Sequence, residues 1–269
     1  MMRKTFALTT LFGLMVSGAH AADDYEARME RWRDLQQAVF DGRSAEPAGD
    51  LVKLDAPKRA LDAALVPITI TTPPGSNITG LSLVIDDNPG PVAAKVRFGT
   101  RGDPGYLALR VRVNQYTLMH AVAETSDGKL YETEKFVKAA GGCSAPVGAN
   151  EVASLAEIGR MKLRLGGKVS AGEPVEAQLM IRHPNFNGMQ MDQIKRTYTP
   201  MRYVQVVDVT LNGEPVLNLE GDISLATDPV IGFRFVPHAR DLPGTLRVVV
   251  RDSDDTVFEH SFDIAAGGS

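Results

Sequence analysis

The sequence predicts an all-β protein made of two antiparallel β-sandwiches that are joined by a linker and preceded by a short helix. From residue 66 onward, short stretches rich in β-branched residues alternate with turn signals about every ten residues. Periodicity is lost only between residues 139 and 151, where Ala, Gly, Ser and Pro dominate. The chain has 269 residues, 43% of them hydrophobic and 23% charged, which suits one or two globular cores and excludes a disordered or fibrous protein.

The strands are predicted from alternating or continuous apolar runs bounded by turn residues. The first sandwich is expected to contain strands at 66–71, 78–85, 92–98, 106–113, 116–123 and 130–137. The second is expected to contain strands at 161–165, 175–181, 204–211, 216–219, 231–235, 246–250 and 258–264. Asn212-Gly213 is a strong signal for a two-residue hairpin turn.

The first 21 residues have the order of a secretory leader. Arg3 and Lys4 precede an apolar run over residues 6–16, and small residues lead up to Ala21, where cleavage is expected. The apolar run is too short to span a bilayer, and no second run of that length follows. The mature protein is therefore expected to be exported and free of membrane segments.

A helix is predicted directly after this leader. Asp23 and Asp24 can cap it, and Gly42 can end it. Apolar residues recur at spacings of four and three at Tyr25, Met29, Trp32, Leu35 and Val39. Such a stripe favours packing against the sheet, while docking to a partner is the alternative. A second short helix is predicted at residues 57–64. The expected organisation is thus a leader at 1–21, a sandwich with its helix at 22–140, a linker at 141–151 and a second sandwich at 152–269.

Several kinds of chemistry have no signature in the sequence. A net charge of −4 argues against a nucleic-acid-binding surface. Phosphate-binding loops, nucleophile elbows and paired metal ligands are missing, so no cofactor, metal site or catalytic residue is assigned. The scattered histidines, including His120 and His183, are expected to be surface residues or internally hydrogen-bonded. The acidic turn at Asp252, Asp254 and Asp255 is expected to be a solvated hairpin tip, with calcium binding as the alternative.

Cys143 is the only cysteine, which excludes an intramolecular disulfide. Gly141, Gly142 and Ser144 surround it with residues of little bulk, and the glycines permit backbone angles that other residues avoid. We therefore expect a cysteine that is hard to bury, carried on a flexible arm that can enter the cleft of another protein. A linker that happens to contain a cysteine is the alternative. An exposed thiol of this kind also predicts dimers joined through Cys143 under oxidising conditions.

Sequence motifs in the two halves resemble the SoxY and SoxZ subunits of the SoxYZ sulfur-oxidation carrier. Val66-Pro67-Ile68-Thr69-Ile70 and the segment from Glu132 to Gly141-Gly142-Cys143 are similar to SoxY. The segments similar to SoxZ are Ile181-Arg182-His183-Pro184, Met201-Arg202-Tyr203-Val204, Asn212-Gly213-Glu214-Pro215-Val216 and Asp228-Pro229-Val230-Ile231-Gly232-Phe233. The resemblance covers nearly everything after the leader, and the chain looks closest to fused SoxYZ-like carriers associated with quinoprotein dehydrogenases.

The resemblance implies immunoglobulin-like sandwiches and a non-enzymatic periplasmic carrier that holds thiosulfate-derived sulfur covalently on Cys143. Its implied partners are periplasmic sulfur-oxidising enzymes and c-type cytochromes, and also a quinoprotein dehydrogenase. One feature departs from the SoxY pattern, because Ser144-Ala145-Pro146 follows the cysteine and the chain continues. An arm held at both ends can protrude by at most roughly 13 Å. The alternative function is a non-covalent accessory module for a quinoprotein dehydrogenase or its cytochrome, docked through sandwich edges or the Trp32 helix.

Overall fold

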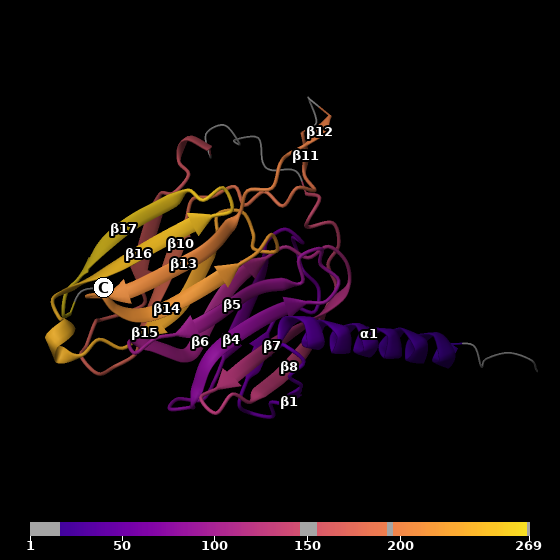
Figure 1. Ribbon diagram of the computed structural model, residues 1–269, viewed down its shortest axis with the longest axis horizontal. Coiled ribbons are helices and arrows are strands. Elements are labelled where there is room, and N and C mark those ends of the chain that lie inside the picture. The colour runs from indigo at the N-terminus through magenta and orange to yellow at the C-terminus, as the bar shows by residue number, and fades with distance from the viewer. Residues whose placement is uncertain (1–16, 146–154, 193–195, 268–269) are drawn as a thin grey trace, which may run out of the picture.

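The computed structural model describes residues 17–145, 155–192 and 196–267 and shows a mostly β protein (Figure 1). The helix α1 (Ser17–Val39) precedes all of the strands. The first half contains β1 (Ala45–Pro47), β2 (Lys53–Asp55), β3 (Val66–Thr71), β4 (Ile78–Ile85), β5 (Val92–Phe98), β6 (Gly102–Val111), β7 (Thr117–Thr125) and β8 (Leu130–Val137). These residues alternate between a buried and a more exposed side, as in β3, because the two faces of each strand meet core and surface.

The second half repeats this organisation. It contains β9 (Met161–Leu165), β10 (Val175–Ile181), β11 (Met191–Asp192), β12 (Thr197–Tyr198), β13 (Val204–Leu211), β14 (Glu214–Gly221), β15 (Val230–Phe235), β16 (Gly244–Asp252) and β17 (Val257–Ile264), with the short helix η1 (Ala239–Asp241) before β16. Every strand predicted from the sequence is present, several with the predicted bounds. The predicted helix at residues 57–64 is wrong, since the described chain there forms bends and turns.

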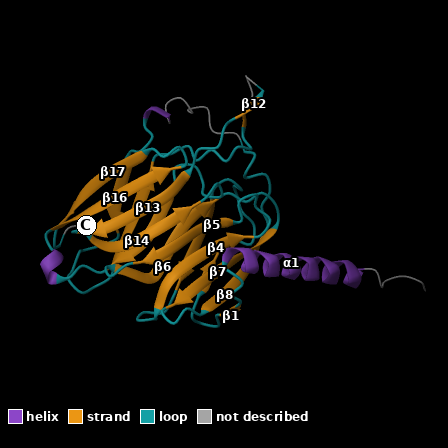
Figure 2. Cartoon of the chain, viewed as in Figure 1, coloured by secondary structure: helices purple, strands orange, loops and turns teal. Residues whose placement is uncertain are grey.

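The two halves are sandwich bodies that share both of their sheets (Figure 2). One sheet has nine strands in the order β1-β8-β7-β4-β5-β14-β13-β16-β17, and the facing sheet has six in the order β2-β3-β6-β15-β10-β9. The halves join where β5 pairs with β14 and β6 pairs with β15, both antiparallel. One continuous buried apolar cluster extends through both halves. The expected pair of sandwiches is therefore present, but they are joined edge to edge and not only through a linker.

The helix α1 lies on the outside of the first half, beside β7 and β8, and continues past the edge of the sandwich (Figure 1). The ring of Trp32 stacks on that of His120 with centroids 3.7 Å apart, and Trp32 joins a second apolar cluster with Phe40, Val84 and Val122. The prediction that this helix covers the sheet is confirmed. Residues 1–16 of the expected leader lie outside the described residues, and α1 includes residues 17–21. Within the described ranges, no helix is long and apolar enough to cross a membrane.

Candidate functional site

Cys143 lies in a hydrogen-bonded turn directly after β8, and it is buried, with 2% of its surface exposed. The Gly141 N–H donates to the carbonyl of Asn114 (2.8 Å) and the Gly142 N–H to that of Val113 (2.9 Å). The expectation that this cysteine is hard to bury is wrong. Gly141, Gly142 and Ser144 were predicted to form a flexible arm. In the structure, their small size lets this segment pack closely against the first half.

Gly142 shows why the turn can lie so close. A Cβ atom at this position would stand 2.0 Å from the carbonyl oxygen of Ala63, a distance that no side chain can occupy. Ser144, by contrast, is exposed, and its hydroxyl donates to the carbonyl of Gly141 (3.3 Å). Gly141, Gly142 and Ser144 therefore form a closed turn in this structure. The later part of the expected linker, residues 146–151, lies outside the described residues.

The second half of the chain covers the same turn from the other side. The Asn187 side-chain amide donates to the carbonyl of Cys143 (2.7 Å), and Asn187 is itself buried. The Asn187 N–H in turn donates to the side chain of Gln190 (3.0 Å), which fixes the conformation of this loop. Cys143 is thus enclosed at the junction between the two sandwich halves.

Arg112, at the end of β6, is the charged residue of this junction. Its Nη2 donates to Thr227 Oγ1 (2.6 Å) and to the carbonyl of Asn185 (3.2 Å), so a residue of the first half holds the loop of the second. Arg112 is 2% exposed, and its Nε has no hydrogen-bond partner among the described residues. Asn88 supports this segment, since its side chain donates to the carbonyl of Arg112 (2.7 Å).

The electrostatics of the junction keep the thiol protonated in the closed conformation. Burial raises the pKa of Cys143 to about 11, an effect that the positive charge of Arg112 partly offsets. Burial also lowers the pKa of Arg112, while the charges of Cys143 and Asp62 act in the opposite direction. Because the thiolate is the nucleophilic form, the closed turn disfavours reaction of Cys143.

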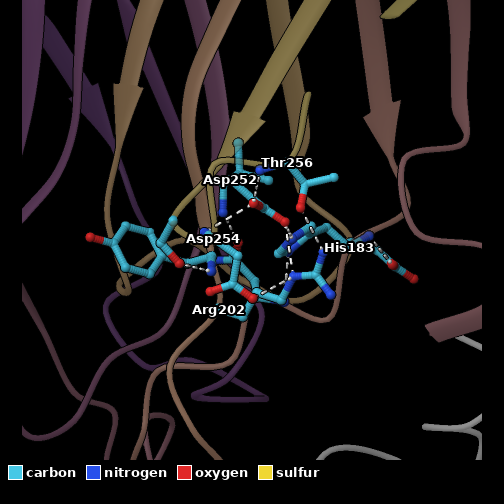
Figure 3. A network of polar contacts seen from close by, with 10 residues as sticks. His183, Arg202, Asp252, Asp254 and Thr256 are labelled. Atoms are coloured by element: carbon cyan, nitrogen blue, oxygen red, sulfur yellow. Dashed lines mark hydrogen bonds and ion pairs between the residues drawn. The ribbon is translucent and has the colours of Figure 1, made fainter. Parts of the chain in front are cut away.

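A buried polar network holds the covering loop in place (Figure 3). His183 Nδ1 accepts a hydrogen bond from the Asn185 N–H (3.0 Å), while its Nε2 faces Asp252 at 3.5 Å. Arg202 Nε donates to the same carboxylate (2.9 Å). Burial lowers the pKa of His183 against the influence of Asp252, which suits a neutral ring that accepts at Nδ1. The network fixes the start of the loop that carries Asn185 and Asn187.

The histidines and the acidic turn differ in how well they match the predictions from the sequence. His120 and His183 are buried and paired with carboxylates, which fits the expectation of internally hydrogen-bonded histidines. The prediction of a solvated hairpin tip is wrong for Asp252, which is fully buried, whereas Asp254 is exposed. No group of three or more metal-ligating side chains occurs among the residues that the structure describes.

A groove of about 1180 Å³ lies next to the junction. Its lining includes Thr227, the residue that Arg112 contacts, and the cationic side chains of Arg110, Lys162 and Arg164. Within the described part of the chain, these three cations are not members of any ion pair. The groove therefore offers positive charge that no ion pair among the described residues neutralises, on a protein whose overall charge is negative.

Fold and site together define a class: a β-sandwich protein of two fused halves that encloses a single thiol where the halves meet. Comparison with family models gives these halves their identity. The model of sulfur oxidation protein SoxY matches residues 36–143, and that of sulphur oxidation protein SoxZ matches residues 163–263. The chain belongs to these sulfur-oxidation families as a fused SoxYZ-like carrier, and Cys143 is the last residue of the SoxY match.

A solved structure gives a further comparison. The sulfur carrier protein SoxY from Chlorobium limicola f thiosulfatophilum is 23% identical, with a TM-score of 0.38, and the match covers 44% of this chain and 99% of that chain. The search of curated proteins gave no match.

Sequence reasoning found Cys143 but missed the residues around it. Arg112, Asn187 and Asn88 belong to no recognisable motif and lie far from the cysteine in sequence. The one available signal was the arginine itself, since a charged residue at the end of an apolar strand is unusual unless it has a partner.

Proposed function

We propose that this protein carries sulfur intermediates, derived from thiosulfate, as a covalent adduct on Cys143 and presents them to partner enzymes in the periplasm. The observation that carries the proposal is the position of the lone thiol, which ends the SoxY match and lies between the two halves beside a buried cation. The leader-like residues 1–21 support export, and the family matches support a role as carrier.

Loading in this scheme is an oxidative conjugation. The Cys143 thiol and thiosulfate form a sulfur–sulfur bond, and one proton and two electrons leave. A c-type cytochrome partner accepts the electrons. The carrier contributes the thiol and the protected position, whereas the partner contributes the oxidant, so Cys143 is an attachment point and not a catalytic residue.

The proposal requires the turn to alternate between the closed state of the structure and an open state that exposes the sulfur. In the closed state the turn is held by the two backbone hydrogen bonds to residues 113 and 114 and by the Asn187 amide. A few hydrogen bonds of about 1 kcal/mol each can be broken when a partner offers compensating contacts. The cationic groove next to the junction, which Thr227 lines, would favour partners whose surface around the sulfur-transfer opening is acidic.

The experiment is the intact mass of the mature protein from the periplasm, before and after treatment with a reductant. Because the chain has one cysteine, an adduct that reductant removes reports on Cys143 alone. We expect such an adduct on the wild type and none on Cys143→Ser. An unmodified thiol, even after incubation with thiosulfate and a c-type cytochrome from the same sulfur-oxidising cells, would reject the carrier function.

The alternative, a non-covalent accessory module, receives less support. Sandwich edges and the Trp32 helix are its two predicted docking faces, and on the helix Trp32 is only 4% exposed because it stacks on His120. Binding to a quinoprotein dehydrogenase stays a prediction from the sequence. Copurification that survives Cys143→Ser but requires residues 23–42 would restore this alternative.

A further inference from the structure

Arg112 is a buried cation that no described carboxylate contacts, since the charge of Asp62 acts on it only from beyond ion-pair distance. Taking a charge out of water is costly unless an opposite charge compensates it, so buried arginines are normally paired. The other strongly buried arginine of the described chain, Arg101, follows this rule, because its Nε contacts Asp241 at 2.7 Å. Arg112 has only neutral acceptors, and among the described residues no carboxylate lies within ion-pair distance of it.

The geometry places this cation beside the thiol. Gly142, the neighbour of Cys143, donates its N–H to the carbonyl of Val113, the neighbour of Arg112. The same loop of the second half contacts both residues, through the Asn185 carbonyl on Arg112 and the Asn187 amide on Cys143. The charges of the two side chains also act on each other. One donor of the guanidinium, Nε, is left without an acceptor.

We propose that Arg112 forms an anion-binding site for the negatively charged end of the sulfur group carried on Cys143. The inference rests on the proposed carrier function and deepens it, because it names the class of cargo that the site favours. Oxidised sulfur groups that end in a sulfonate supply both the missing negative charge and oxygen acceptors for the free Nε–H. A neutral adduct supplies neither, and it leaves the cation uncompensated.

The test uses chemical probes, so it depends on no partner protein. Tetrathionate is a dianion: the Cys143 thiolate attacks one of its two central sulfurs, a new sulfur–sulfur bond forms, the central bond breaks and thiosulfate leaves. The product is the anionic thiosulfate adduct, reached without an external oxidant. The neutral disulfide 4,4′-dithiodipyridine reacts with the same thiolate by the same type of exchange. A change in how often the turn opens alters both rates by the same factor. A change in their ratio between wild type and a variant therefore reports the effect of charge.

The ratio of the two rate constants is measured on the full-length mature protein and on two variants. Arg112→Gln removes the buried cation, and Arg97→Gln removes an exposed cation on β5, away from the groove, as the matched control. We expect the tetrathionate to dithiodipyridine ratio to fall about tenfold or more in Arg112→Gln, the size of one lost charged hydrogen bond. In Arg97→Gln it should change by less than about threefold. Equal ratios in the two variants, or a wild-type thiol that dithiodipyridine labels and tetrathionate does not, overturn the inference.

A second measurement needs no substitution and so does not depend on the folding of a variant. Wild-type protein loaded with tetrathionate should melt at a higher temperature than wild-type protein that carries the neutral iodoacetamide adduct. A melting temperature for the anionic adduct that is equal or lower contradicts the site. The results also separate the two proposals. If the probes show that Cys143 prefers anionic reagents but the native protein carries no adduct, the anion-binding site stands and the carrier function is rejected.

Discussion

Cys143 must meet two opposing requirements, access to partner proteins and protection from side reactions. A carrier thiol must reach its partners, yet a free thiol in an oxidising compartment is exposed to unwanted disulfide exchange. Burial resolves the conflict, because the closed turn holds the sulfur as a neutral thiol with its pKa raised to about 11. The dimer that an exposed thiol predicted therefore requires the turn to open first. Gly142 is the residue that permits this closure.

Gly142→Ala is expected to expel Cys143 from its site. The added Cβ would collide with the Ala63 carbonyl, which is backbone and cannot move aside cheaply. Leaving the site lowers the pKa of the thiol toward its ordinary value, so alkylation by iodoacetamide at pH 8 should accelerate by about tenfold to hundredfold. The measurement is the alkylation rate followed by intact mass.

Gly128→Ala is the control for this prediction. Gly128 lies in the turn between β7 and β8, has a positive φ of 80° and has nothing within 4 Å of its added Cβ. It imposes backbone strain without opening the Cys143 turn. Equal alkylation rates in the two variants would contradict the role assigned to Gly142.

At the scale of elements, α1 packs on the sheet around the buried His120 ring, in addition to the ion pair between Arg31 and Asp87. His120 on β7 is fully buried under Trp32, with Asp86 at 3.2 Å from Nε2 and Glu132 at 3.3 Å from Nδ1. Burial by itself lowers the pKa of His120, but the hydrogen bonds and charges of the two carboxylates outweigh it and raise the pKa to about 9. The protonated ring therefore links β7 by charge to Asp86, just after β4, and to Glu132 on β8, and α1 packs on this ring through Trp32.

This arrangement predicts a loss of stability at high pH. Because the pKa of His120 is higher in the folded than in the unfolded protein, its contribution is complete below about pH 6.5 and is lost as the pH rises through 9. The free energy of unfolding should fall by up to about 3 kcal/mol across this window. Urea titrations from pH 6 to 10 measure it, with the fluorescence of Trp32, the only tryptophan, reporting on α1.

His120→Gln provides the comparison for this prediction. The amide cannot take up a proton, so the variant should be less stable at pH 6 and should lose the fall in stability between pH 6.5 and 9. An unchanged pH dependence in the variant would show that His120 does not supply the effect.

At the scale of the whole molecule, the two family domains behave as one folded body. Both sheets continue from one half into the other. Because the halves share one apolar core, each half would lose part of its core contacts if the other unfolded. The buried pair of Arg101 and Asp241 crosses this junction, and Asp241 also accepts from the His238 N–H (2.8 Å). A fused chain therefore places Cys143 at a joint whose geometry is fixed by more than the linker.

Asp241→Ala is expected to destabilise the whole protein by about 3–5 kcal/mol, because it leaves a buried guanidinium unpaired. Unfolding should remain a single transition, with Trp32 fluorescence in the first half coinciding with the far-UV circular dichroism of both halves. Glu176→Ala is the control, since its pair with Arg234 is exposed and is worth less than about 1 kcal/mol. Separate transitions for the two signals would contradict one cooperative body.

Local patterns were enough to predict most of the strands. Strands such as β3, β4 and β8 have the predicted bounds because β-branched alternation and flanking turn residues act within a few residues. Short strands such as β1 and β2 carry too few residues for a pattern. The predicted helix at 57–64 failed for a related reason, since a brief helical pattern has little stability without an apolar face to bury, and Leu61 there is fully exposed.

Local sequence patterns were enough to predict the two β halves, the covering helix and the cysteine between the halves. Contacts between distant residues establish that the sheets fuse. They also establish that Cys143 is buried near Arg112, with its carbonyl hydrogen-bonded to the Asn187 amide. The difference comes from the distance along the sequence between the residues that interact. Strand formation and turn chemistry depend on neighbours along the chain, whereas burial and charge compensation depend on residues that meet only when distant strands pair.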